Sequence, residues 1–109
     1  MKPSHSYYAV IFSAQRTAVD DGYGAMASEM EALAEKMPGY IGFESARNDD
    51  GFGIAVSYWE SEAAIKEWKN HVDHTYARKR GRETWYSDYM VRVAKVERAY
   101  RMKRVEEQV

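Results

Sequence analysis

The segment WKNHVDHTYARKRGRETWY, from Trp68 to Tyr86, holds the side chains of this chain that are best suited to chemistry. His71 follows Trp68 at the spacing of one helical turn, so on a helix the imidazole can share a pocket with the indole and act as a general base or a ligand. A surface histidine paired with Glu67 would show the same spacing. We predict Trp68 and His71 as the catalytic residues, with a plain surface helix as the alternative.

His74 adds a second imidazole one turn further on, and imidazole and carboxylate groups are common metal ligands. Histidines at this spacing also occur on many solvated helices, and no other cluster of histidines or acids accompanies them, so no metal site is predicted. The basic run RKRGR suits the C-terminal end of a helix, where cations compensate the dipole and Gly81 can end the last turn. Arg78 is the member of this run that is expected in a pocket, where its planar donors would bind a carboxylate, a phosphate or a haem propionate.

Aromatic residues in and near this segment could line a pocket for a flat aromatic ligand, because aromatic walls stack on such ligands while polar tips orient them. Their alternative use is in the core or in a dimer interface. The predicted substrate-binding residues are Trp59, Trp85, Tyr86 and Arg78.

Charge and composition exclude several classes of protein. Lysine and arginine number 16 against 17 aspartate and glutamate residues, so there is no general attraction to nucleic acid or to an anionic membrane. The absence of cysteine excludes disulfides, thiolate metal sites and a cysteine nucleophile. The start resembles no signal peptide and no apolar run reaches membrane-spanning length, so we expect a soluble, cytoplasmic protein.

The elements that must position these residues form one expected domain over residues 1–109, with its core in residues 7–100. Residues 7–14 (YYAVIFSA) predict a strand buried on both faces, and residues 25–37 an amphipathic helix that Pro38 and Gly39 end. The runs 40–47 and 53–60 flank the turn sequence NDDG and predict a hairpin. Ser61 can cap a second helix over residues 62–80, a long strand follows over 83–100, and a charged tail over 101–109.

This order of elements predicts an α+β fold, a ferredoxin-like βαββαβ arrangement with a four-stranded antiparallel sheet and helices on one face. Alternation in the last strand places Trp85, Tyr89, Val91 and Val93 on one face and Tyr86, Met90, Ala94, Val96 and Tyr100 on the other. The sheet face without helices then needs a cover, so we predict a homodimer with its sheets packed face to face.

Three stretches of the chain, MPGYIGFES, GFGIAVSYWESEAAIKEW and RVAKVERAY, resemble the antibiotic biosynthesis monooxygenase family of dimeric α/β-barrel proteins. The resemblance covers most of residues 7–100 and implies a dimeric barrel with one pocket in each protomer, between the sheet and the helices. The family includes cofactor-independent oxygenases of polycyclic quinols and phenols, haem-degrading monooxygenases, and members without an established activity. The W-x-x-H-x-x-H, GR and WY pattern of residues 68–86 is most similar to a poorly characterised subgroup.

The haem-degrading branch of the family is a more distant match. That branch carries an asparagine on the first strand, a tryptophan on the helix after the W-E-S-E stretch, and a haem-ligating histidine about three helical turns later. Here YWESE and Trp68 match, but Arg78 lies near the histidine position, and the first strand offers Ser13 or Gln15.

The resemblance therefore implies a monooxygenase-like protein that acts on a small aromatic or quinol-type compound, with no cofactor predicted and haem as the alternative. Such an oxygenase must deprotonate its substrate and hold the anion near oxygen in a dry cavity. His71 would be the base, and Tyr86 or Arg78 would stabilise the anion. A haem-binding or haem-degrading protein and a non-catalytic ligand-binding dimer remain the other interpretations.

Overall fold

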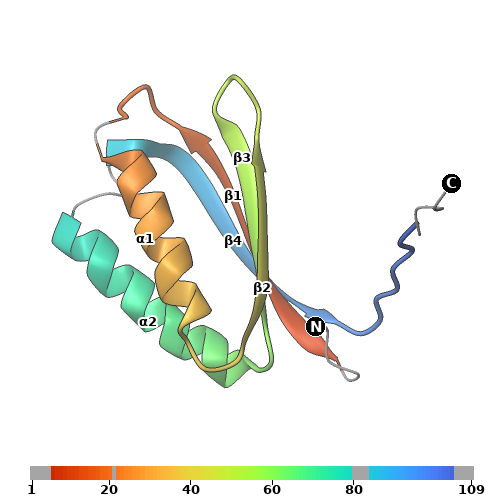
Figure 1. The fold of residues 1–109 in the computed structure, drawn as a ribbon. Helices are drawn as coiled ribbons and strands as arrows, with labels where there is room; N and C mark the ends of the chain where they lie inside the picture. Colours follow the sequence, from red (N-terminus) through yellow and green to blue (C-terminus); the bar gives the residue numbers. More distant parts are fainter. Residues whose placement is uncertain (1–5, 21, 80–83, 105–109) are drawn as a thin grey trace, which may run out of the picture.

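The computed structural model describes residues 6–20, 22–79 and 84–104, without the side chains of residues 75–79. It has two layers, one antiparallel sheet and two helices that cover a single face of it (Figure 1). The elements are β1 (Tyr7–Arg16), α1 (Tyr23–Glu35), β2 (Tyr40–Arg47), β3 (Phe52–Trp59), α2 (Glu62–Lys79) and β4 (Tyr86–Val96). The predicted ferredoxin-like βαββαβ order is confirmed, and the strands lie in the order β2-β3-β1-β4.

Local sequence explains where the helices begin and end. Gly22 adopts the left-handed conformation before α1, so this helix starts at Tyr23, slightly earlier than predicted. Ser61 caps α2 as expected, because its Oγ accepts a hydrogen bond of 3.1 Å from the backbone N–H of Ala64. Between the helices, Gly39 (φ 84°) turns the chain into β2, and its carbonyl accepts a 2.8 Å hydrogen bond from Glu60 N–H.

The strand register decides which side chains face the helices. The central strand β1 has buried residues on both faces, Ala9 and Ala14, as its uncharged sequence predicted. On the helix side, Val10 lies between Ser57 of β3 and Val93 of β4. Side chains of the sheet and of the helices form two hydrophobic clusters between the layers. One contains Trp59, Ala34 and Ile65, and the other contains Trp85, Met26, Ala14 and Tyr86.

A β-bulge changes the face on which Tyr86 lies. In the pairing of β1 with β4, Gln15 lies opposite Asp88 and Arg16 lies opposite Tyr86, so Ser87 is an extra residue. Simple alternation predicted Tyr86 on the same face as Met90 and on the opposite face from Tyr89, and that prediction was wrong. Because the bulge shifts the register by one residue, the Tyr86 ring joins the helix-facing side and is 9% exposed.

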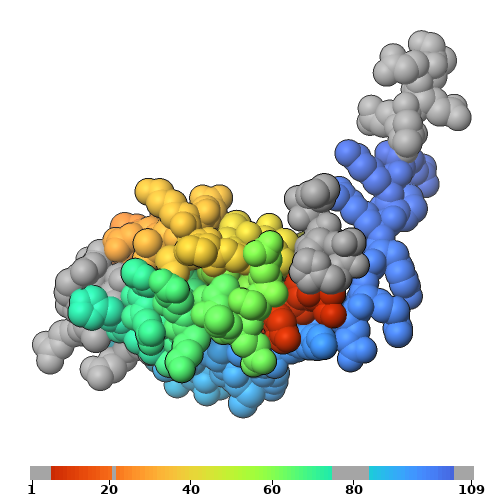
Figure 2. Space-filling model, turned by 90° about the horizontal axis from the view of Figure 1, so that it is seen from below, coloured from red at the N-terminus to blue at the C-terminus, as the bar shows by residue number. Residues whose placement is uncertain are grey.

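The other face of the sheet has no helix over it. Phe52, Ile54 and Met90 are exposed there, next to half-buried Ile11 and Val56. Beyond β4, residues 97–104 lead away from the domain without regular secondary structure (Figures 1 and 2). Within the described ranges, no helix is long and apolar enough to cross a membrane.

Candidate functional site

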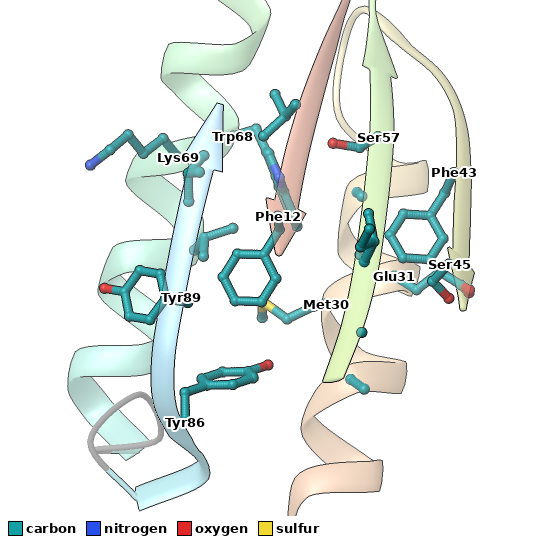
Figure 3. Close-up of a pocket in the computed structure, with 18 of the residues that line it drawn as sticks. Phe12, Met30, Glu31, Phe43, Ser45, Ser57, Trp68, Lys69, Tyr86 and Tyr89 are labelled. Carbon is teal, nitrogen blue, oxygen red and sulfur yellow. The ribbon is translucent and has the colours of Figure 1, made fainter. Parts of the chain in front are cut away.

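A cavity of about 860 Å³ lies between the sheet and the helices, and all six elements contribute to its lining (Figure 3). This volume falls in the usual range of small-molecule sites, roughly 300–1,000 Å³. Toward the edge strand β4 the cavity is open, because Tyr89, Val91 and Val93 line it and yet are 41%, 51% and 51% exposed. The site can therefore admit a ligand from the β4 side.

One wall of the cavity is the Trp68 indole, which α2 places against the sheet. Its ring stacks on that of Trp59, with centroids 5.7 Å apart and planes inclined by 26°. Trp59 is fully buried, and its Nε1 donates a 2.8 Å hydrogen bond to Ser57 Oγ. The buried tryptophan therefore holds the orientation of the half-buried Trp68.

A second aromatic wall lies on β1 and β4. Phe12 stacks on Tyr89 at 5.5 Å between centroids and meets Tyr86 edge-on at 5.3 Å. These three rings line the cavity together with Met30 of α1 (Figure 3). Such walls suit a flat aromatic ligand, which can stack on them.

The end of the cavity near the start of α1 is polar. Tyr23 and Tyr86 both line it, with their hydroxyl oxygens 3.5 Å apart. Arg47, at the end of β2, also lines it and donates a 2.9 Å hydrogen bond from Nη2 to the Tyr23 hydroxyl oxygen. Three donor-bearing side chains from three elements therefore converge at this end of the cavity.

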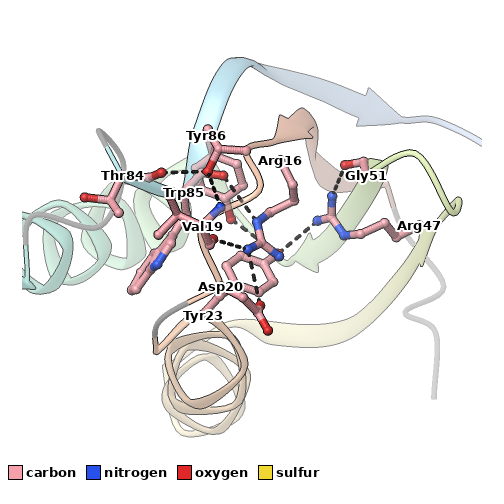
Figure 4. A network of polar contacts seen from close by, with 10 residues as sticks. Arg16, Val19, Asp20, Tyr23, Arg47, Gly51, Thr84, Trp85 and Tyr86 are labelled. Carbon is pink, nitrogen blue, oxygen red and sulfur yellow. Dashed lines mark hydrogen bonds and ion pairs between the residues drawn. The ribbon is translucent and has the colours of Figure 1, made fainter.

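A network behind this polar end holds the Tyr23 ring in place (Figure 4). The Arg16 guanidinium carbon lies 3.4 Å from the centre of the Tyr23 ring, a cation–π contact. Arg16 donates from Nε to the Trp85 carbonyl oxygen at 3.2 Å and from Nη2 to the Val19 carbonyl oxygen at 2.7 Å. Trp85 packs edge-on against Tyr23 at 5.8 Å, so the ring is fixed from two sides.

The other charged residues of the lining lie on the two helices. On α2, Lys69 Nζ donates to Asp73 Oδ2 at 2.6 Å. On α1, Glu31 lines the cavity and is half-buried. Burial, followed by the Glu35 and Glu31 carboxylates, raises the pKa of Tyr40. The negative charge of Glu31 therefore acts near the start of β2, at the other end of the strand from Arg47.

The predicted site residues divide into four groups, the last of which is His71. Trp68 and Tyr86 line the cavity. Trp59 and Trp85 are buried behind it, where they support Trp68 and Tyr23 in place of lining the cavity themselves. Arg78 lies on α2, but its side chain is outside the described part of the structure.

His71 is exposed and is not among the lining residues. The face of α2 that lines the cavity carries Ile65, Trp68, Lys69, Val72 and Asp73. With about 100° of rotation per residue, His71 points roughly 130° away from the centre of that face, and His74 lies on the opposite side. The catalytic role of His71 stays a prediction.

The sequence interpretation missed Tyr23 and Arg47. Tyr23 precedes the stretch predicted as a helix, and only the early start of α1 brings it to the cavity. Arg47 had a usable signal: it follows Phe43 and Ser45 with the period of two that places all three on one face of β2.

The described side chains contain no group of three or more histidine, cysteine, aspartate or glutamate residues that could hold a metal ion. No histidine among them lines the cavity. The chemistry that this lining can perform is therefore stacking on an aromatic ligand, hydrogen bonding to a ligand oxygen, and proton transfer with a carboxylate or a phenol.

Fold and cavity together define the class, a ferredoxin-like α+β protein with a cavity between its sheet and its helices. Residues 12–80 match the family model described as antibiotic biosynthesis monooxygenase, and the chain belongs to that family. The family resemblance predicted from sequence motifs is thereby confirmed.

Two relatives and one solved structure illustrate the range of the family. The chain is 51% identical over 96 residues to the uncharacterized protein YqjZ of Bacillus subtilis, covering 88% of this chain and 84% of that protein. It is 28% identical over 107 residues to the jasmonate monooxygenase ABM of Pyricularia oryzae, covering 91% of this chain but only 49% of that longer protein. The crystal structure of SnoaB, a cofactor-independent oxygenase from Streptomyces nogalater, has the same fold, with a TM-score of 0.61, 9% identity and coverage of 93% of this chain and 100% of SnoaB.

Proposed function

We propose that this protein is a monooxygenase that acts, without a resident cofactor, on a small aromatic compound of the phenol or quinol type. The observation that carries the proposal is the cavity of about 860 Å³, walled by Trp68, Phe12, Tyr86 and Tyr89 and open only in part. Membership in the antibiotic biosynthesis monooxygenase family supports it. So do the names of two similar proteins, a jasmonate monooxygenase and a cofactor-independent oxygenase.

The proposed reaction converts a phenol that has a hydrogen on its para carbon into a quinone. The substrate loses two hydrogens, one atom of O₂ becomes the second quinone oxygen, and the other atom leaves as water. All the electrons that O₂ accepts come from the substrate, so no external reductant is required. The protein must remove the phenol proton, hold the anion and keep bulk water away from it.

The cavity residues can share these tasks. Trp68 and Phe12 would stack on the substrate rings and limit access of water. Two carboxylates line the cavity, and since Asp73 is already bonded to Lys69, we assign Glu31 as the proton acceptor. His71 remains the acceptor proposed from the sequence, and mutagenesis can decide between the two.

Oxygen consumption with 1-naphthol or anthrone tests the proposal. With isotopically labelled oxygen gas, each quinone product should carry one labelled atom, and O₂ uptake should equal product formed. Stoichiometric binding of these compounds with no uptake above the uncatalysed rate would contradict the proposal. It would instead indicate a non-catalytic ligand-binding protein.

Two alanine variants on α2 form a matched pair for the same assay. Trp68→Ala removes a cavity wall and should reduce turnover, whereas His71→Ala removes an exposed side chain. Loss of turnover in a folded His71→Ala protein would assign the base to His71. Unchanged turnover there, with loss in Glu31→Gln, would assign it to Glu31. Full activity in Trp68→Ala would exclude the site described here.

Haem was the sequence-based alternative. Haem iron in oxygen-binding proteins is commonly held by a histidine, and the described histidines, His71 and His74, are both exposed and outside the cavity lining. The described lining therefore does not fit a histidine-ligated haem, and we assign no step to haem. Saturable haem binding, followed by loss of its absorption band with a reductant in air and catalase present, would reverse this conclusion.

We also propose that the protein forms a homodimer through the sheet face that carries no helix. The exposed side chains of Phe52, Ile54 and Met90 support this, because an apolar sheet face is usually covered in a stable protein. Packing of a second sheet there would bury these side chains. It would leave the cavity, on the opposite face, free to bind its ligand.

A further inference from the structure

We propose that Arg47, Tyr23 and Tyr86 form an anion-binding site at one end of the cavity, so that the substrate is a flat aromatic compound with an anionic oxygen. The proposal deepens the proposed function, because it rests on the cavity being the substrate site. Substrate rings would lie along the aromatic walls. The anionic oxygen would meet the three polar side chains.

The hydrogen bonds at this end leave the hydroxyl proton of Tyr23 available to a ligand. An arginine side chain can only donate, so its 2.9 Å bond makes the Tyr23 oxygen an acceptor. Tyr23 can then donate its own proton to a ligand oxygen. In the contact with Tyr86 the Tyr86 hydroxyl is the donor and the Tyr23 oxygen the acceptor, at a long 3.5 Å, so it does not use the Tyr23 proton, and a charged oxygen would be a stronger partner for the Tyr86 hydroxyl.

Arg47 lies near the carboxylates of Asp20, Asp49 and Asp50, which line an adjacent hollow with it, but it forms an ion pair with none of them. Among the described residues, ion pairs join Arg16 to Asp20 and Lys69 to Asp73, and none includes Arg47. Glu31, the unpaired carboxylate of the lining, lies two helical turns along α1 from Tyr23, about 12 Å away along the axis. Arg47 therefore supplies a positive charge to the part of the cavity lining where the tyrosine hydroxyls also gather.

Gly53 makes the position of Arg47 possible. The two residues are opposite each other in the β2–β3 pair, on the helix-facing side. A Cβ at Gly53 would lie 2.8 Å from Arg47 Cζ and 2.9 Å from Nη1. The guanidinium thus occupies the space that a side chain at residue 53 would fill, and Nη1 also donates to the Gly51 carbonyl oxygen. Gly53 is a positioning residue for Arg47.

Binding of 2-naphthoate and of its neutral analogue 2-naphthamide tests the proposal through quenching of tryptophan fluorescence, to which Trp68 contributes from the cavity wall. The two probes have the same rings and nearly the same shape. Wild-type protein should bind the carboxylate about tenfold more tightly, a modest factor because the Arg47 side chain is exposed to water. A third probe, 4-nitrophenol, reports on a phenolate, since its ionised form absorbs visible light.

Three variants locate the effect. Arg47→Gln removes the charge and should abolish the preference for naphthoate while naphthamide still binds. Gly53→Ala keeps the charge but displaces the guanidinium, and it should weaken the same preference with little loss of stability, because the flexible end of Arg47 can move. Tyr23→Phe should reduce the preference for naphthoate in part. Arg98→Gln removes an equal charge from an exposed position beyond β4 and is the matched control.

The outcomes are distinct. An Arg47-dependent preference for naphthoate alone assigns a carboxylate substrate. A preference for nitrophenolate alone assigns a phenolate, and it would also exclude Glu31 as the proton acceptor, because Glu31 lies about 12 Å along α1 from Tyr23. Equal binding of naphthoate and naphthamide, with no preference for nitrophenolate, overturns the anion site and leaves the oxygenase proposal standing. An Arg47-dependent preference without oxygen consumption would support the anion site and contradict the oxygenase proposal. If Arg98→Gln changes the preference as much as Arg47→Gln, the effect is one of net charge and the proposal is wrong.

Discussion

Replacing Gly39 with alanine should destabilise the domain by two separable effects. Gly39 has φ 84°, a left-handed conformation that costs a residue with a Cβ about 1–2 kcal/mol. The added Cβ would also lie 2.7 Å from the Cβ of Ala64 in α2, closer than such atoms approach in real structures. Relief of this overlap by local movement costs about 1–3 kcal/mol. The expected total is therefore about 2–5 kcal/mol.

The double-mutant cycle of Gly39→Ala with Ala64→Gly separates the two effects. Ala64→Gly removes the atom that Gly39→Ala would meet, at the cost of about 1 kcal/mol for glycine in a helix. In the double variant the steric term disappears while the backbone term and the helix term remain. The two substitutions should thus couple favourably by about 1–3 kcal/mol.

Urea unfolding measures the free energy of unfolding of the wild type, the two single variants and the double variant. One fixed protein concentration is used, since association would otherwise change the apparent stability. Gly51→Ala is the matched control, because Gly51 also has a positive φ (95°) but its nearest contact would be the flexible end of Gln15, at 3.0 Å. It should cost the backbone term and a small adjustment at Arg16, whose Cβ would lie 3.3 Å away, and it should show no coupling to Ala64→Gly. Additivity of Gly39→Ala and Ala64→Gly within about 0.5 kcal/mol would refute the predicted contact.

Three further predictions concern the cap, the open sheet face and one tyrosine. Ser61→Ala should cost about 1 kcal/mol in urea unfolding, through loss of the hydrogen bond from Ala64 N–H; no change would exclude a capping role. Ile54→Glu should convert the proposed dimer to a monomer in light scattering, and a dimer that persists would place the interface elsewhere. The hydrogen bond to Glu44, with burial and the Glu44 charge, raises the pKa of Tyr58 from 10.0 to about 12. The folded state thus favours the protonated phenol, and this stabilisation should be present below pH 10 and be lost as the pH rises through about 12. Unfolding at several alkaline pH values should show a smaller loss in Glu44→Gln, and an equal loss would contradict the assignment.

The secondary structure and topology followed from local patterns. The alternation in β2 and β3, the turn at Asn48–Gly51, the Ser61 cap and the apolar spacing of α1 each depend on residues close in the chain. Family membership followed from short motifs that include Trp68. Such features are readable because neighbours along the chain determine them.

The composition of the site depended on contacts between distant parts of the chain. The helical spacing of Trp68 and His71 was read correctly, but one turn of helix still separates a lining residue from an exposed one, and only packing against the sheet decides which is which. The bulge at Ser87 turned Tyr86 toward the cavity, and no local pattern reveals a register shift that the partner strand defines.

By itself, then, the sequence determined the order of elements, the class of fold, the family and the presence of Trp68 in the cavity lining on α2. The tertiary structure decided that Trp59 and Trp85 support the cavity from behind, and that Tyr23 and Arg47 join Tyr86 at its polar end. The physical reason is that periodicity specifies the face of an element, whereas a pocket is defined by the distances between faces. Those distances depend on the size of each side chain. Gly53 is an example, because its lack of a side chain lets the Arg47 guanidinium lie against the sheet.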